Sequence, residues 1–170
     1  MTTKNPLADE FAPNGYELPE SNSFMKFAQG KNKFRILSSL VSGYEYWTAD
    51  KKCVRSRTEF TETPDIAIDE NGKSHVAHFW VLAVYNYAAE SIQQLEITQK
   101  GIQKYILGLV NDKESWGNPK GYDLVVNREG EGMSTKYTVT ANPPKEMPAD
   151  ILADYAKANI NLESIFDEKE

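Results

Sequence analysis

The sequence is poor in the residues that build disulfides and zinc sites. Its 170 residues include one cysteine, Cys53, and two histidines, His75 and His78. A single thiol cannot form an internal disulfide framework, and this set offers too few ligands for a Cys/His zinc cluster. We therefore expect a reduced protein that holds no metal and needs no cofactor.

Long apolar runs are also missing. The longest strongly apolar stretch, residues 79–85, is far shorter than the ~20 residues needed to span a bilayer. The opening residues, MTTKNPLADE, contain no apolar core of a secretory signal. We expect a cytoplasmic protein that does not enter membranes. The hydrophobic content of 40% is nevertheless sufficient for a packed core.

Motifs for catalysis are lacking as well. There is no Walker-type lysine loop, and the glycines of residues 128–132, REGEG, match a hairpin turn rather than a phosphate cradle. Cys53 has no neighbour that marks it as a nucleophile. His75 and His78 flank a segment expected to be extended, where their spacing does not make two metal ligands. We expect a binding protein rather than an enzyme.

Charge is present but unevenly distributed. The chain has 19 basic and 25 acidic residues, a net charge of -6, which by itself argues against a nucleic-acid partner. Residues 26–58, however, contain eight basic and two acidic residues, whereas residues 145–170 contain three basic and seven acidic ones. The chain is therefore polarised, with a basic segment near its start and an acidic C-terminus.

The residue pattern divides the chain into three parts. Residues 1–24 contain several Pro, Gly, Asn and Ser and read as an irregular arm. Residues 25–145 carry the periodic segments of one domain, and residues 146–170 read as a C-terminal helix with a short acidic tail. Strands are predicted over residues 31–37, 44–47, 52–60, 78–87, 91–99, 122–128 and 134–140.

Helical periodicity appears twice. Ile102, Tyr105, Ile106 and Leu109 fall on one face of a helix over residues 100–112. A second helix is expected to begin at Pro148 and to carry an apolar stripe through Leu162. A mainly β chain with a helix before its last two strands is typical of the oligonucleotide-binding (OB) fold, a five- to six-stranded Greek-key barrel. A plain antiparallel sandwich fits the same pattern.

Cationic and aromatic side chains interleave in the basic segment. A surface that binds single-stranded nucleic acid needs cations along the backbone and rings on which bases stack. We predict the first half of such a surface at Lys31, Lys33, Arg35, Tyr44, Tyr46, Trp47, Lys51, Lys52, Arg55 and Arg57. Tyr44 and Tyr46 should share one strand face, adjacent to the cations that follow them.

Two further groups extend this prediction. Tyr85 and Tyr87 either enlarge the stacking surface or cap the core with hydroxyls that reach water. Arg128 and Lys136 either contact phosphates or pair with the glutamates of the intervening turn.

The motifs resemble a known family. GKNKFRIL at residues 30–37, GYEYW at 43–47 and the spacing of KGYDLVVNREGEGMSTKYTVT at 120–140 are similar to phage-encoded single-stranded-DNA-binding proteins of the OB type. The similarity covers residues 30–143 and is most specific in the hairpin. The hairpin positions are Gly121, Asp123, Leu124, Arg128, Gly130, Gly132, Thr135, Tyr137 and Val139.

This resemblance implies a protein that coats single-stranded DNA in the host cytoplasm during phage replication and recombination. It also implies a C-terminus that contacts replication or recombination proteins, here through Phe166, Asp167 and Glu168. Two departures stand out: this chain lacks the Cys/His zinc cluster of better-known members, and its acidic tail is shorter. We expect a structure independent of zinc and weaker regulation by the tail.

Two hypotheses remain open at this stage. In the first, cations neutralise phosphates, rings stack bases, and the acidic C-terminus competes with DNA for the cationic groove. In the second, the protein is an interaction or assembly component whose basic and aromatic face docks an acidic partner.

Overall fold

The computed structural model describes residues 24–61, 66–68 and 75–166. Most of the arm expected over residues 1–24 lies outside these ranges. The strands and helices are β1 (Phe24–Met25), β2 (Gly30–Ile36), β3 (Val41–Trp47), β4 (Cys53–Ser56), β5 (Ala77–Asn86), β6 (Ser91–Ile97), α2 (Lys100–Asn111), β7 (Asp123–Glu129), β8 (Lys136–Ala141) and α3 (Ala149–Ala158). Short 3-10 helices occupy Pro119–Gly121 (η1), Gly132–Ser134 (η2) and Leu162–Phe166 (η3).

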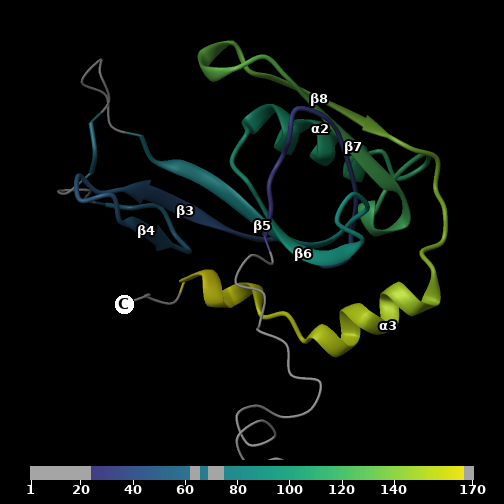
Figure 1. The fold of residues 1–170 in the computed structure, drawn as a ribbon. Helices are drawn as coiled ribbons and strands as arrows, with labels where there is room; N and C mark the ends of the chain where they lie inside the picture. The colour runs from purple at the N-terminus through teal and green to yellow at the C-terminus, as the bar shows by residue number, and fades with distance from the viewer. Residues whose placement is uncertain (1–23, 62–65, 69–74, 167–170) are drawn as a thin grey trace, which may run out of the picture.

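All eight strands belong to one mixed sheet with β5 at its centre (Figure 1). One edge of β5 pairs with β6, and the other pairs first with β3 and then with β2. Beyond β2 follow β7 and β8, while β4 extends the sheet from β3. Every pair is antiparallel except that of β1 with β6. The expected mainly β fold is confirmed, and the strand predicted over residues 78–87 forms the centre of the sheet.

The sheet is open. In the described ranges the strand order ends at β1 and at β8, and no hydrogen-bonded ladder joins these two strands to close a barrel. The segment between β1 and β2 lies beside the β7–β8 hairpin: the rings of Phe27 and Tyr137 are 6.0 Å apart. Gln29 donates to the Gly130 carbonyl at 2.6 Å, and Arg128 donates to the Phe27 carbonyl at 2.9 Å.

Both predicted helices form, with different outcomes for their apolar faces. Ile102, Ile106 and Leu109 of α2 are buried, whereas Tyr105 is exposed at the margin of the stripe. The terminal helix ends earlier than expected, because Asn159 takes the left-handed conformation that closes a helix. Leu162 therefore belongs to η3 and not to α3. None of the described helices is both long enough and apolar enough to cross a membrane.

Two apolar clusters lie on opposite faces of β5. Its inward residues Trp80, Leu82 and Val84 pack in a large cluster that includes Phe34 of β2 and the buried face of α2. Its outward residues Phe79, Val81 and Ala83 form a smaller cluster with Leu162. Figure 1 shows α2 on one side of β5 and α3, followed by η3, on the other. The C-terminal segment is therefore the cover of the second face.

Candidate nucleic-acid interface

The face of the sheet that carries Phe79, Val81 and Ala83, which we call the outer face, collects most of the predicted site residues. Residues two apart in a strand share a face, and Cα partners in neighbouring strands do too. Arg35 lies opposite Tyr85 and Arg55 lies opposite Glu45. By this register the strand residues of the site on the outer face are Lys31, Lys33, Arg35, Trp47, Arg55, Tyr85 and Lys136.

Tyr44 and Tyr46 share a strand face as predicted, but it is the opposite face. The Tyr44 ring packs against His78, with ring centroids 4.8 Å apart. Tyr46 is buried and meets the edge of Phe60 at 4.8 Å. The prediction that these two rings lie beside Arg55 is wrong, because Arg55 is opposite Glu45 and adjacent residues alternate between faces. Trp47 is the aromatic residue of β3 on the outer face, and it is 54% exposed.

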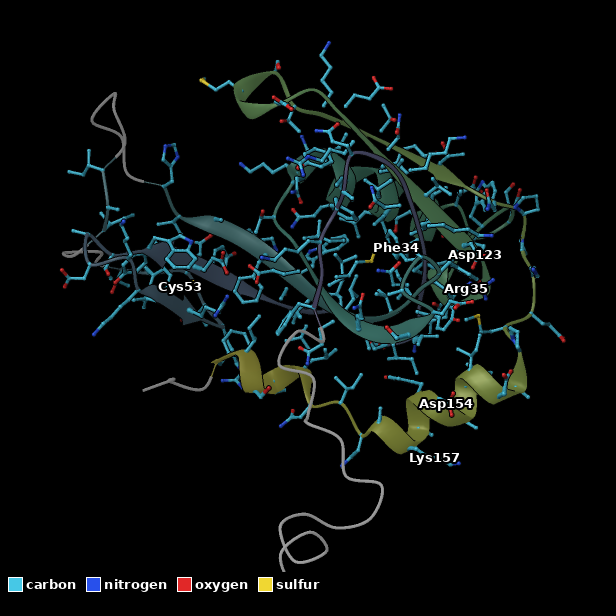
Figure 2. The ribbon with its side chains drawn as sticks, in the orientation of Figure 1. Phe34, Arg35, Cys53, Asp123, Asp154 and Lys157 are labelled. Carbon is cyan, nitrogen blue, oxygen red and sulfur yellow. The ribbon has the colours of Figure 1, made fainter. Side chains whose placement is uncertain are left out.

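Arg35 is an interior residue rather than a surface cation. Its side chain is 1% exposed, and its Nε donates to Asp123 Oδ1 at 2.8 Å (Figure 2). A second donation goes to the Lys120 carbonyl at 3.1 Å. The structure does not support the phosphate contact predicted for Arg35, because its guanidinium is buried and already paired with the Asp123 carboxylate. Arg128 is half-buried, and its side chain donates to the Phe27 carbonyl.

Arg55 lies between two carboxyl groups, those of Glu45 and Glu96. Its Nε is 3.1 Å from Glu45 Oε1, and a terminal nitrogen is 3.3 Å from Glu96 Oε2. Burial, reinforced by the neighbouring Glu45, raises the pKa of the Glu96 carboxyl to about 8. Burial also raises the pKa of the Cys53 thiol to about 11, which keeps it protonated at neutral pH. The charge of Arg55 is thus largely compensated within the protein.

Arg57 is exposed, but two residues of the C-terminal segment contact its guanidinium. Its guanidinium is 2.7 Å from Glu163 Oε2 and lies over the Phe166 ring, 4.3 Å from the centroid. The Phe166 ring also packs against Phe79 at 5.8 Å. A Cβ atom at Gly43 would lie 2.8 Å from Phe166 and 2.6 Å from the Ser56 carbonyl. Glycine at this position therefore permits the close approach of both.

Tyr85, Tyr87 and Lys33 form a second aromatic and cationic group on the outer face. The two rings meet edge to face at 5.0 Å, and Lys33 Nζ lies 4.5 Å from the Tyr87 centroid. Tyr87 donates to Asp123 Oδ1 at 2.8 Å. Burial and this hydrogen bond raise the pKa of the Tyr87 hydroxyl to about 12. Both rings remain half-exposed, so each predicted role, stacking or capping, fits the geometry.

Four predicted lysines remain without a recorded ion pair in the part of the chain that the structure describes: Lys31, Lys51, Lys52 and Lys136. Lys51 and Lys52 occupy the turn between β3 and β4, and Lys51 has a φ of 66°, which places it at the tight bend. Exposed Trp47 ends β3 just before this turn, and the exposed Asp50 lies between it and Lys51. The tip of the β3–β4 hairpin therefore presents one free ring and two free cations.

The acidic partners of the predicted cations were missed by the sequence analysis. Glu45 could have been found, because a β3–β4 hairpin register places it opposite Arg55. Asp123 and Glu163 are 88 and 106 residues from their arginines, and no local pattern links them. Of the predicted partner-binding residues, Phe166 is packed on the outer face, and Asp167 and Glu168 lie outside the described residues.

No group of three or more His, Cys, Asp or Glu among the described residues is arranged to hold a metal ion. Comparison with protein-family models, with curated proteins and with solved structures finds no match to this chain. A function for this chain must therefore be inferred from its sequence motifs and from the geometry of the outer face.

Proposed function

We propose that the protein binds single-stranded DNA without strong sequence preference and protects it during phage DNA replication or recombination. One observation carries the proposal: Arg57 on the outer face is bound by a carboxylate and an aromatic ring from the chain's own C-terminal segment. A single-stranded nucleotide offers the same two groups, an anionic phosphate and a planar base. Glu163 and Phe166 therefore occupy Arg57 in the manner expected of the ligand.

The strand order supports the same proposal. If β2 and β3 are taken as one bent strand on the edge of β5, and the short strands β1 and β4 are set aside, the order is that strand, then β5, β6, α2, β7 and β8. An OB-like fold has this order, with its helix before the last two strands. We propose that residues 24–29 fill the gap between β6 and β8 in place of direct pairing.

The proposed contacts divide by chemistry. Phosphates are bound by cations that border the outer face: Lys31, Lys33, Lys51, Lys52, Arg57 and Lys136. Bases stack on Trp47, Tyr85 and Tyr87. DNA must displace the C-terminal segment from Arg57, so the acidic tail and the DNA compete, as the polarised charge of the sequence suggests.

Fluorescence anisotropy tests this proposal with labelled oligo-dT and a duplex of equal length, each titrated at low and moderate salt. We expect tight binding to the single strand, a steep loss with salt as counterions are released, and little binding to the duplex. Absence of binding to either form at low salt would contradict the proposal and favour docking of an acidic protein partner.

Variants locate the interface. Arg57→Ala should weaken binding to all sequences and reduce the magnitude of the salt slope by about 1, as expected when one phosphate contact is lost. Tyr85→Ala should cost about 1–3 kcal/mol if a base stacks there. Lys104→Ala is the matched control, because Lys104 is exposed on α2, on the other side of the sheet. An equal effect of the control would place the interface elsewhere.

A second substitution tests whether the C-terminal segment competes with DNA, because the competition predicts that DNA affinity rises when the segment is weakened. Phe166→Ala removes the ring on Arg57 and should tighten binding at low salt by about three- to ten-fold, because the closed state becomes less populated. Weaker or unchanged binding by Phe166→Ala would show that the segment does not compete with DNA.

A further inference from the structure

An apolar groove lies on the side of the sheet that α2 covers, away from the outer face. Its volume is about 660 Å³, and it is enclosed by α2, the bend between β2 and β3, and η1. Trp80 lies among its lining residues, and Leu40 and Leu107 are 43% and 44% exposed at its margin. Exposed leucines beside an apolar cavity are typical of an interaction site.

The groove has a cationic margin. Lys113 and Lys120 line it and make no recorded ion pair with a described residue. Asp112 and Glu114, on the same turn as Lys113, are exposed but do not line the groove. An occupant that fits must therefore bring an apolar side chain flanked by acidic groups.

The tip of the β7–β8 hairpin has this chemistry. Met133 is the most exposed of the large hydrophobic residues, with its side chain entirely in solvent. Residues 129–135, from the end of β7 to the residue before β8, contain two acids, Glu129 and Glu131; of the two bases that flank them, Arg128 donates to the Phe27 carbonyl and Lys136 begins β8. A methionine side chain is flexible and fills irregular apolar sites well.

This tip is held in one conformation by its own backbone. Ser134 Oγ donates to the Glu131 carbonyl at 2.7 Å, and Thr135 N donates to the Gly132 carbonyl at 3.2 Å. Gly130 has a φ of 83°, and a side chain there would collide with the Ser134 carbonyl. Met133 is thus presented before any partner arrives, which lowers the entropic cost of docking.

We propose that Met133 of one copy inserts into the groove of a second copy, with Glu129 and Glu131 placed against Lys113 and Lys120. The two complementary surfaces are different regions of the chain, so the contact is head to tail and repeats from copy to copy. An open row of subunits results, and the contact forms without DNA. It is therefore independent of the proposed DNA binding, although such a row suits a protein that coats a strand.

Engineered cysteines test the contact directly. In a Cys53→Ser background, Met133→Cys and Leu107→Cys variants are mixed under a mild oxidant and separated on a non-reducing gel. We expect a disulfide-linked heterodimer in excess over either homodimer. Met133→Cys mixed with Ala153→Cys is the control, because Ala153 is exposed on α3, far from the proposed contact. Equal crosslinking in both mixtures would overturn the proposal, as would preferential Met133→Cys homodimers.

Analytical ultracentrifugation supplies the second readout. The wild-type chain should self-associate as its concentration rises, and Met133→Glu or Leu107→Glu alone should remain monomeric. Mixing these two variants should give dimers and no larger species, because each retains only one intact half of the contact. A wild-type chain that stays monomeric at every concentration, or variants that associate as the wild type does, would overturn the proposal.

Discussion

The two faces of β5 are covered in very different ways. The inward face is sealed by α2, whose buried isoleucines join a cluster that includes residues from five strands, β1, β2, β5, β6 and β7. The outward face is covered by the C-terminal segment, where Leu162 of η3 is, among the described residues, the one buried hydrophobic residue of the cluster outside β5, and Tyr155 of α3, Ile160, Ile165 and Phe166 are only partly buried. The remaining contacts of η3, Glu163 with Arg57 and Phe166 with Phe79, are exposed or half-exposed.

This difference separates a permanent core from a removable cover. A face sealed by many interlocking side chains can be opened only by unfolding the domain. A face sealed by one short segment opens locally at a smaller free-energy cost. The cationic and aromatic residues of the proposed interface lie on the second face, where a ligand can reach them.

The largest effect should follow from Ile106→Ala in α2. The change leaves a cavity in the inner cluster and should lower the free energy of unfolding by about 2–5 kcal/mol. Urea unfolding followed by tryptophan fluorescence measures it. A loss below about 1 kcal/mol, the size expected for a substitution at the surface, would mean that α2 is not part of the core.

Leu162→Ala should have a smaller effect on global stability, about 1–2 kcal/mol, because the short segment can rearrange around the missing side chain. Hydrogen exchange should instead increase locally at η3 and at the amides it covers. A global loss equal to that of Ile106→Ala would show that the two covers are equivalent.

The pH dependence of stability should reveal the carboxyl pair beside Arg55. The pKa of Glu96 is raised from 4.5 to about 8 in the folded protein. The folded state then retains a proton that the unfolded chain has already lost between these values, so the free energy of unfolding falls as pH rises through this window. Tm measured from acidic to mildly alkaline pH should show this decline in the wild type, and Glu96→Gln should abolish it. An unchanged slope in Glu96→Gln would assign the decline to another group.

Glu163→Gln should have the smallest effect on stability. The side chains of Glu163 and Arg57 are 54% and 61% exposed, and exposed pairs typically contribute about 0–1 kcal/mol. Its effect on DNA binding should be more evident, because Arg57 loses its competing carboxylate. A thermal melt and an anisotropy titration on the same sample separate the two. Stability loss without any change in affinity would favour a purely structural role for the pair.

The secondary structure could be predicted from local sequence signals, whereas the site depended on how distant segments pair. The continuous apolar run within residues 78–87 and the spacing of Ile102, Ile106 and Leu109 are local signals, and they predicted β5 and the buried face of α2. The end of α3 at Asn159 depends on one left-handed residue, a signal too weak to place Leu162 outside the helix. Tyr44 and Tyr46 had the right mutual spacing, but their face relative to Arg55 required the β3–β4 register.

The sequence by itself determined the mainly β architecture, the helix before the last hairpin and the separation of basic and acidic segments. Only the tertiary structure decided which cations remain free. Arg35 is neutralised by Asp123 and Arg57 is bound by Glu163 and Phe166, while Lys51 and Lys52 stay exposed at a hairpin tip. The reason is that local periodicity sets secondary structure, whereas the charge of a surface depends on partners brought together across the whole chain.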